Sequence, residues 1–436
     1  MWDTWLYWRQ GTYYLFNLFS PFDGGGFCGI AMATSVDGVH WNEHGAILEK
    51  ADDVTWLGTG SVWKAPAIGA DSRFILNFSE WRGNGQTIFF AESNDLLHWR
   101  RLDNEYEFRP DPRWYRTDGR WDCIFTIDRP GGGYFGYWTA NPLDFTGFGF
   151  GESLDGVTWN ALEPPRIDWG DVAPMPEMES GAVAKIGDRY YTMLGSYHAS
   201  EAHSSGMFAF VAESPSGPFR PLGKNFEFLT SPLDRHYSYF TRFFPFGDAL
   251  LVNYHAILSD AEVYFAPLKQ AVVDADGIMR LAWWPQNGVV KQDWKESPVL
   301  DMRTGGAISY DAVDGLLVEG RLDIQADSTD SHPEFNVSYG QQGRKMRFGV
   351  QAGGVLDIAD IGADGTSCLL EHVDRGLELH GSADFRILLM HRFVEVYVSN
   401  YLIQALTLPD APAGRLEIAG ACERVQYWCQ FEEYRI

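Results

Sequence analysis

The chain has 436 residues, and its 45% hydrophobic and 15% aromatic content can fill one large core and a second, smaller one. Asp and Glu outnumber Lys and Arg by 59 to 34, and the net charge of −25 argues against nucleic acid or anionic membrane as a partner. No apolar run approaches the roughly 18 residues of a membrane span. We therefore expect a soluble, globular protein that binds a neutral molecule.

The N-terminal residues enter strand-like sequence at once. Met1-Trp2-Asp3-Thr4-Trp5 has neither the basic start nor the apolar run of a signal peptide, which predicts a cytoplasmic protein. The cysteines are odd in number and lack the spacing of a disulfide framework or a zinc site. We expect reduced thiols at Cys28, Cys123, Cys368, Cys422 and Cys429.

A short hairpin signature recurs five times along the first part of the chain. Its leading residue, which we call the hairpin position, is Tyr13, Phe74, Tyr134, Tyr190 and Leu250 in turn, at separations of 61, 60, 56 and 60 residues. Evenly spaced copies of one hairpin are typical of a radial array of sheets. The five copies predict an all-β fold that contains a five-bladed β-propeller.

A second phrase lies between the hairpins and has the same period. It begins at Ser35, Ser93, Ser153 and, in degenerate form, Ser214, in steps of 58, 60 and 61 residues. Its Ser-x-Asp-Gly core is typical of a turn, because the Asp side chain caps its own backbone and Gly adopts a positive φ. The acids of this phrase are therefore expected to form turns and not to act in catalysis.

The character of the sequence changes near residue 300. Before that point, the segment 277–284 is expected to supply outer strands of the fifth blade. After it, alternating strands such as 316–324 and 385–390 are separated by Gly-rich and Asp-rich turns, which is typical of a β-sandwich. We expect a propeller over residues 1–300 and a C-terminal β-sandwich over residues 301–436.

Three carboxylates recur at nearly the same place in the repeat. Asp3 precedes its hairpin position by ten residues, Asp122 by twelve and Glu179 by eleven. The innermost strand of each blade lines the central channel of a propeller, so these side chains are expected to face one another. In blades two and five the corresponding segments, 62–64 and 238–240, offer aromatic and polar side chains. Acids and aromatic rings around one pocket are suited to a sugar ring.

Glycoside hydrolysis requires two carboxyl groups in different protonation states. Close packing of three acids raises the pKa of at least one, and Glu179, with apolar neighbours, is the candidate general acid. Asp3 is then the candidate nucleophile, and Asp122 the residue that holds sugar hydroxyls. Glu177 is the local alternative to Glu179, because residues two apart in a strand share a face. The plainer alternative is that the acids cap turns or pair with Arg113, Arg116, Arg120 or Arg242.

Further candidates for contact with the sugar are mostly aromatic. They are Trp2, Trp56, Ser61, Trp63, Trp121, Glu177 and Tyr239. For each Trp the competing interpretation is a place in the core, which is more common in all-β proteins. The run Gly131-Gly132-Gly133 lacks the strand-to-helix context of a phosphate-binding loop. We expect no cofactor and no metal, a small-molecule or oligosaccharide substrate, and a monomer or homodimer.

Around the three acids the chain resembles glycoside hydrolase family 32, the invertase, inulinase and levanase family. Trp2-Asp3-Thr4-Trp5 is similar to the Trp-x-Asn-Asp-Pro-Asn motif that carries the nucleophile of that family. Trp121-Asp122-Cys123 matches its Arg-Asp-Pro motif, Glu179-Ser180-Gly181 its Glu-Cys-Pro motif, and Gly58-Thr59-Gly60-Ser61 its Ser-Gly-Ser segment. The segment 385–400 resembles the sandwich strands that the family appends to its propeller.

The resemblance implies a retaining, exo-acting β-fructofuranosidase of the sucrose, fructo-oligosaccharide or fructan type, with Asp3 as nucleophile and Glu179 as acid/base. Asn and Pro are missing around Asp3, and Trp121 stands where the family has Arg, so an altered sugar or linkage specificity stays open. The segment 62–68 is similar to glycoside hydrolase family 43, which leaves an inverting arabinofuranosidase or xylosidase open. Glycosyl transfer at the same site and a non-catalytic carbohydrate-binding propeller are the remaining alternatives.

Overall fold

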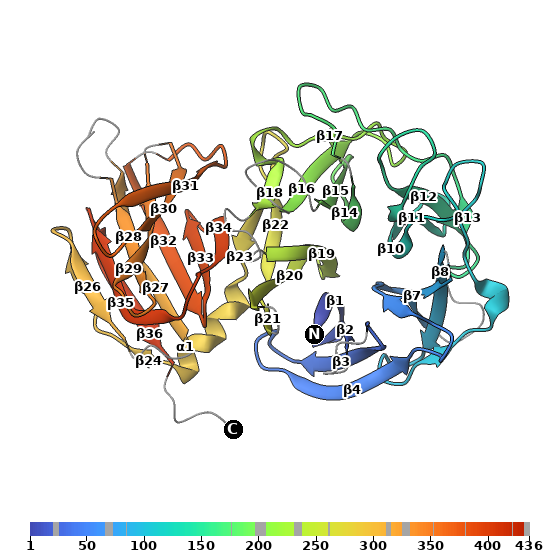
Figure 1. The fold of residues 1–436 in the computed structure, drawn as a ribbon, viewed down its shortest axis with the longest axis horizontal. Coiled ribbons are helices and arrows are strands. Elements are labelled where there is room, and N and C mark those ends of the chain that lie inside the picture. Colours follow the sequence, from blue (N-terminus) through green and yellow to red (C-terminus); the bar gives the residue numbers. More distant parts are fainter. Residues whose placement is uncertain are drawn as a thin grey trace.

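The computed structural model describes residues 1–20, 26–65, 73–83, 85–175, 177–196, 206–230, 238–259, 262–310, 315–324, 332–351, 353–379, 381–420 and 422–430, with the backbone alone at 238–240 and 259. Almost all regular structure in these ranges is β-strand. Figure 1 shows a ring of five sheets beside a two-layered β-structure. The prediction of a five-bladed propeller followed by a sandwich is confirmed.

Blades one and three are four-stranded antiparallel sheets whose first strand lies innermost in the ring (Figure 1). Blade one consists of β1 (Trp2–Arg9), β2 (Thr12–Phe19), β3 (Gly29–Ser35) and β4 (Asn42–Glu49). Blade three consists of β10 (Trp121–Asp128), β11 (Tyr134–Ala140), β12 (Gly149–Ser153) and β13 (Asn160–Ala161).

The other blades elaborate this plan. The inner strand of blade two is interrupted, and its elements are β5 (Trp56–Gly58), β6 (Val62–Lys64), β7 (Phe74–Arg82), β8 (Gly85–Ser93) and β9 (Arg100–Arg101). Blade four consists of β14 (Glu179–Ile186), β15 (Arg189–Ser196), β16 (Gly206–Ala212), β17 (Arg220–Pro221) and β18 (Glu227–Thr230). Blade five consists of β19 (Ser238–Phe246), β20 (Ala249–Ser259), β21 (Glu262–Phe265), β22 (Lys269–Val273) and β23 (Met279–Trp283), so the segment 277–284 supplies an outer strand as predicted.

Both repeated phrases have the structure that the sequence predicts. Each hairpin position is the first or second residue of the second strand of its blade. In the first Ser-x-Asp-Gly turn, Asp37 Oδ1 accepts hydrogen bonds from the backbone N–H groups of Val39 and His40 at 2.9 and 2.8 Å. Asp95 and Asp155 make the same pair of bonds in the next two turns, so these acids are turn formers.

The C-terminal part is a sandwich of two sheets. One layer contains β24 (Lys295–Glu296), β25 (Leu300–Met302), β27 (Gly315–Ile324), β32 (Gly381–Met390), β33 (Phe393–Val398), β34 (Tyr401–Thr407) and β36 (Cys422–Cys429). The other contains β26 (Gly306–Ser309), β28 (Glu334–Tyr339), β29 (Arg344–Val350), β30 (Val355–Ile361), β31 (Ser367–Asp374) and β35 (Pro412–Ala419). The apolar residues that alternate along both layers meet in one core, as the strand patterns predict.

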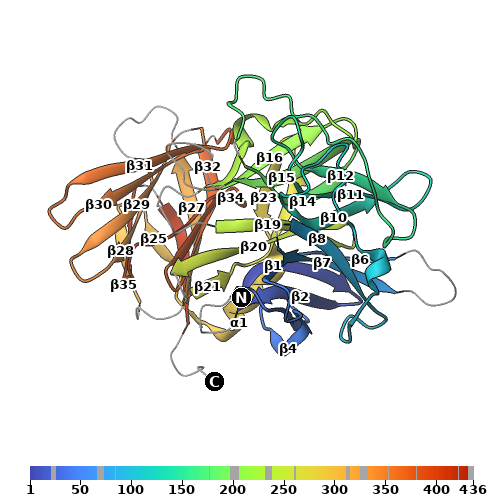
Figure 2. The same ribbon diagram turned by 45° about the vertical axis from the view of Figure 1, so that its right-hand side comes forward.

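The two parts are joined through a continuous sheet, because β23 of blade five pairs with β34 of the sandwich at Ala282 and Tyr401. Figure 2 shows these strands side by side at the junction. A buried ion pair between Lys269 and Glu395 lies next to it, with no exposed surface on either side chain. The Tyr397 hydroxyl donates a 2.7 Å hydrogen bond to Glu395. Burial lowers the pKa of Lys269 to about 8, although Glu395 opposes this shift.

Helices are short throughout the described ranges: the 3₁₀ turns η1 (Asn104–Tyr106), η2 (Gly223–Asn225) and η3 (Pro285–Val289), and the α-helix α1 (Val290–Asp293). Among the described residues, no helix has the length and apolarity that a membrane crossing requires. No disulfide joins cysteines of the described residues, and Cys123 and Cys422 are buried.

Candidate active site

Four of the five inner strands carry a β-bulge or register shift at the same level of the channel. The shifts fall between Trp2 and Trp5 in β1, Asp122 and Phe125 in β10, Ser180 and Ala182 in β14, and Tyr239 and Arg242 in β19. In blade two, the gap between β5 and β6 lies at this level. A bulge bends its strand and re-aims the adjacent side chains. The three predicted acids all lie in or directly beside these irregularities.

The acids reach this level by two different backbone conformations. Asp122 and Glu179 are equivalent, because each pairs with the residue five places after the hairpin position of its blade. In β1 that place belongs to Trp2, and Asp3 lies one residue further on, inside the bulge. The φ of Asp3 is +48°, a left-handed conformation that is strained for a residue other than glycine. The similar sequence offsets therefore reflect a common level and not one common register.

The counterparts proposed for blades two and five need separate comment. The choice of segment 62–64 in blade two is wrong, because β6 lies beyond the gap and Gly58 of β5 holds the equivalent place opposite Ser79. The inner strand of blade two is interrupted between β5 and β6, so counting residues back from the hairpin position Phe74 gave the wrong segment. In blade five the backbone of Tyr239 holds the equivalent place opposite His255, and the side chain of Tyr239 lies outside the described residues.

Asp122 and Glu179 share one cation. Arg120 Nη2 donates a hydrogen bond of 2.8 Å to Glu179 Oε1 and one of 3.2 Å to Asp122 Oδ2. Oxygens of the two carboxylates lie within 4.8 Å of each other. Ser79 Oγ donates a 2.6 Å hydrogen bond to Asp122 Oδ1, and Gln86 Nε2 donates one of 2.7 Å to Ser79 Oγ. Asp122 is thereby fixed on both oxygens by blade two and its own strand.

The cluster is almost dry: Asp3 is 6% exposed, Asp122 2% and Glu179 5%. Burial raises the pKa of Asp3 well above its ordinary value, and the nearby carboxylate of Glu179 raises it further, while Arg242 opposes both. Burial likewise raises the pKa of Glu179, against the effect of Arg120. Because like charges in a dry site cannot all persist, the cluster retains a proton where isolated acids have lost theirs.

Blade two packs its backbone against Asp122. A Cβ atom at Gly58 would lie 2.5 and 2.7 Å from the two carboxylate oxygens and 2.1 Å from Ser79 Oγ. Only glycine fits at this place. The neighbouring Thr59 Oγ1 donates a 3.3 Å hydrogen bond to the backbone oxygen of Asp3. The segment that resembled a Ser-Gly-Ser motif therefore touches two of the three acids.

The donor set does not suit a metal ion. Asp122, Cys123 and Glu179 have potential ligand atoms within 4.8 Å of one another. The guanidinium of Arg120 already forms ion pairs with both carboxylates, however, and occupies the side where a cation would bind. Burial also raises the pKa of the Cys123 thiol, which disfavours the thiolate that binds metals.

The aromatic candidates fall into two groups. Trp2 and Trp56 are partly exposed: Trp2 precedes Asp3 and lies 5.0 Å from the His255 ring, and Trp56 lies in β5, two residues before Gly58, and stacks on Trp81 at 5.7 Å. Trp63 and Trp121 are buried in the aromatic core between blades two and three. The strand alternation explains this for Trp121, since adjacent residues of β10 face opposite sides.

The remaining candidates are also separated by the fold. Ser61 Oγ donates a 2.5 Å hydrogen bond to the backbone oxygen of Ile124, within the bulge of β10 and not to an acid. Glu177 is exposed and precedes β14, whereas Glu179 is buried in the cluster. Of the arginines considered as partners, Arg120 pairs with the acids, while Arg113 and Arg116 pair with Asp111 and Asp118.

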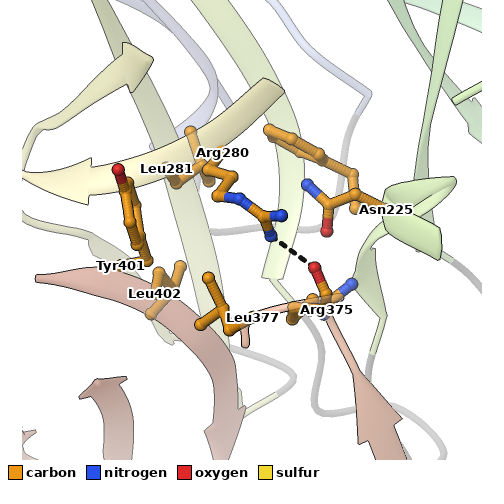
Figure 3. Close-up of a pocket in the computed structure, with 8 residues that line it drawn as sticks. Asn225, Arg280, Leu281, Arg375, Leu377, Tyr401 and Leu402 are labelled. Atoms are coloured by element: carbon orange, nitrogen blue, oxygen red, sulfur yellow. Dashed lines mark hydrogen bonds between the residues drawn. The ribbon is translucent and has the colours of Figure 1, made fainter. Parts of the chain in front are cut away.

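Several cavities formed by the described residues lie away from the acids, and two of them are in or beside the propeller core. One of about 480 Å³ opens at the other end of the channel and is lined by inner-strand residues beyond the bulges, among them Tyr7, Trp63 and Phe243. The other, drawn in Figure 3, lies between β23, β34 and the chain around Arg375, where Arg280 donates a hydrogen bond to the Arg375 backbone oxygen. Its volume of about 10 Å³ holds at most one water molecule.

Sequence reasoning did not identify two members of the site. Arg120 was considered only as a structural partner, although its place two residues before Asp122 puts both side chains on one face of the chain. The sequence does contain a signal for Ser79. This residue lies five places after a hairpin position, and the equivalent residues Thr139 and His255 are also polar.

The arrangement of the whole chain is found in solved enzyme structures. Sucrose-6-phosphate hydrolase from Lactobacillus gasseri superposes with a TM-score of 0.71 at 14% identity, over 97% of this chain and 88% of that one. Exo-inulinase from Aspergillus awamori gives 0.68 at 14% identity, over 98% and 95%. The glycoside hydrolase family 32 β-fructofuranosidase of Bombyx mori gives 0.65 at 13% identity, over 97% and 89%.

The chain has the fold of glycoside hydrolase family 32. The shared fold spans both the propeller and the sandwich, since almost the full length superposes. No protein-family model and no curated protein sequence matches the chain. At this level of identity the likeness establishes the architecture, and a function has to be argued from the site.

Proposed function

We propose that the protein is a glycoside hydrolase of β-fructofuranosides that acts from the chain end with retention of configuration. The observation that carries the proposal is the cluster of three buried carboxylates from β1, β10 and β14, in the fold of β-fructofuranosidases. Two acids with different environments and a third that is held by hydrogen bonds provide the groups that the reaction requires.

Each acid has one role in this proposal. Glu179 donates a proton to the glycosidic oxygen while Asp3 attacks the anomeric carbon, so that the leaving sugar departs as an alcohol and a fructosyl ester forms on Asp3. Glu179, now ionised, removes a proton from water, whose oxygen displaces Asp3. Asp122, fixed by Arg120 and Ser79, accepts hydrogen bonds from sugar hydroxyls.

At the start of the reaction Glu179 has to be protonated and Asp3 ionised. The ionised Glu179 contributes to the raised pKa of Asp3. A proton on Glu179 removes this repulsion, and the nearby Arg242 then favours ionised Asp3. The bond from Arg120 to Glu179 opposes that arrangement, so we propose that it weakens when the substrate binds. This distribution gives an ionised nucleophile, Asp3, and an acid, Glu179, with a proton to donate.

Substitution of the acids tests the proposal directly. We expect Asp3→Asn and Glu179→Gln each to lower kcat on sucrose or a short fructan by about 10³-fold or more, with the fold retained. Glu177→Gln is the matched control, because it removes an exposed acid two residues away, and it should stay within about twofold of wild type. Turnover near the wild-type value in either of the first two variants would remove that acid from its role.

One alternative loses part of its support. The segment that resembles glycoside hydrolase family 43 begins with Val62, and Trp63 Nε1 donates a 3.1 Å hydrogen bond to the backbone oxygen of Gly156, away from the acids. The rest of it, 66–68, lies outside the described residues. Arabinosides and xylosides therefore belong in the substrate panel as comparators. Turnover of these alone would favour the inverting pentosidase, sugar products longer than the substrate would favour transfer, and saturable binding without products would favour a non-catalytic propeller.

A further inference from the structure

The second strand of each blade has two positions that face the inner strand of the following blade. These positions lie three and five residues after the hairpin position, and we call them the +3 and +5 positions. The +3 residues are Phe16, Asn77, Tyr137, Met193 and Asn253. The +5 residues are Leu18, Ser79, Thr139, Gly195 and His255. Strand pairing makes each set structurally equivalent. In every blade the +5 residue pairs with the inner strand just before the irregularity, and the +3 residue pairs with it just after.

Blade two forms hydrogen bonds to the inner strand of blade three from its +3 and +5 positions. The side-chain amide of Asn77 accepts a 2.9 Å hydrogen bond from the backbone N–H of Ile124 and donates one of 3.0 Å to the backbone oxygen of the same residue. Ile124 lies within the bulge that follows Asp122. Ser79 at the +5 position holds the Asp122 carboxylate itself, at 2.6 Å.

The same positions act between two other pairs of blades. Thr139 of blade three accepts a 2.9 Å hydrogen bond from the backbone N–H of Ser180, the residue after Glu179. Asn253 of blade five donates hydrogen bonds of 2.9 and 3.2 Å to the backbone oxygen and Oγ1 of Thr4, the residue after Asp3. In all three blades that carry an acid, the backbone one or two residues after the acid is therefore held by the preceding blade.

The two remaining blades have no such polar contacts at these positions. Phe16 and Leu18 of blade one and Met193 of blade four pack in apolar clusters, and Gly195 has no side chain. These residues face the inner strands of blades two and five, which carry none of the three acids. The hydrogen-bonding +3 and +5 residues thus coincide with the blades that precede an acid.

A bulge explains why such contacts are needed. A bulged residue has no partner in its own ladder, so its buried N–H and C=O groups must be satisfied from elsewhere, and the partner fixes the direction of the bend. We infer that Asn77, Ser79, Thr139 and Asn253 are positioning residues that aim the three acids from the neighbouring blades. Their effect on turnover rests on the proposed function, whereas their effect on acid position does not.

A matched pair of threonines tests this inference. Thr139 and Thr192 are both buried, and both bond to the backbone of β14: Thr139 to Ser180 beside Glu179, and Thr192 to Ala182 beyond the bulge, at 2.8 Å. Thr139→Val should lower kcat on sucrose by about tenfold or more and shift the alkaline limb of the pH profile, because Glu179 is misplaced. Thr192→Val should lose similar thermal stability and keep kcat within about twofold. Thr139→Ser, which keeps the hydroxyl, should restore the wild-type value.

Crystal structures of these variants give a readout that does not depend on activity. We expect the Glu179 carboxyl group to move in Thr139→Val and to stay in place in Thr192→Val. If wild type hydrolyses no fructoside, the proposed function fails and the position of Glu179 still decides the inference. An unmoved Glu179 in Thr139→Val, or equal activity losses in the two valine variants, would overturn it. If Thr139→Val does not fold, Ser79→Ala with the position of Asp122 provides the same decision.

Discussion

The contact between Gly58 and Asp122 predicts a large effect from one added methyl group. In Gly58→Ala the new Cβ would lie 2.5 and 2.7 Å from the Asp122 oxygens and 2.1 Å from Ser79 Oγ, where ordinary contact begins at 3.4 Å. The carboxylate must therefore retreat by about 1 Å, which breaks its 2.6 Å bond with Ser79. A displacement of this size in a catalytic cluster costs about 10²-fold in turnover, and overpacking costs about 1–3 kcal/mol of stability.

The assay is the initial rate on sucrose or a short fructan, together with thermal unfolding of the same preparation. Gly349→Ala is the matched control, because Gly349 is also a buried strand glycine and its Cβ would meet only the Asp357 backbone oxygen, at 3.9 Å. We expect kcat/KM to fall by about 10²-fold in Gly58→Ala and to stay within about threefold in the control. Equal activity in Gly58→Ala and wild type would refute the placement of Asp122 against the backbone of blade two.

Three further predictions follow from the charges. Arg120→Met removes the cation beside Glu179, so the pKa of Glu179 rises and the alkaline limb of the kcat/KM profile should move to higher pH; an unmoved limb would exclude this coupling. Asp3→Asn should raise the unfolding temperature at pH 7, because ionising an acid whose pKa is raised in the folded state destabilises the fold. The gain should vanish as the pH falls towards 3.8, the pKa of the unfolded state, since Asp3 is then protonated in both states. A gain that persists at that pH would contradict the raised pKa of Asp3. Glu395→Gln leaves Lys269 buried without a counter-charge and should cost about 3–5 kcal/mol in urea unfolding, part of which Lys269→Met should recover in the double variant; a loss below about 1 kcal/mol would contradict the buried pair.

The fold could be predicted because each repeat is marked by residues that are close together in the sequence. Turn chemistry at Asp37 and its copies, and hairpin positions such as Tyr13, depend on a few adjacent residues and a constant spacing. The level of the three acids followed from the same spacing. The one-residue offset of Asp3 did not, because a bulge with a φ of +48° is set by packing between blades.

Contacts between blades were the part that the sequence could not supply. Arg120 stands two residues before Asp122, but its bond to Glu179 joins residues 59 apart and depends on how blades three and four meet. Trp63 and Trp121 were candidates for sugar contact, but both are buried in the core between blades two and three. The sequence of a single strand indicates which residue faces the channel. A hydrogen bond across the channel depends on how the blades pack, which the sequence of one strand does not indicate.

The configuration of the first product decides whether the protein is a retaining β-fructofuranosidase. Wild-type protein is mixed with sucrose, fructo-oligosaccharides and the pentoside comparators in an NMR tube, and the anomer released is recorded before mutarotation. We expect β-fructofuranose as the first product of a fructoside, formed through an ester on Asp3 and absent in Asp3→Asn. Release of the opposite anomer, or no hydrolysis of any fructoside by wild type, would contradict this expectation.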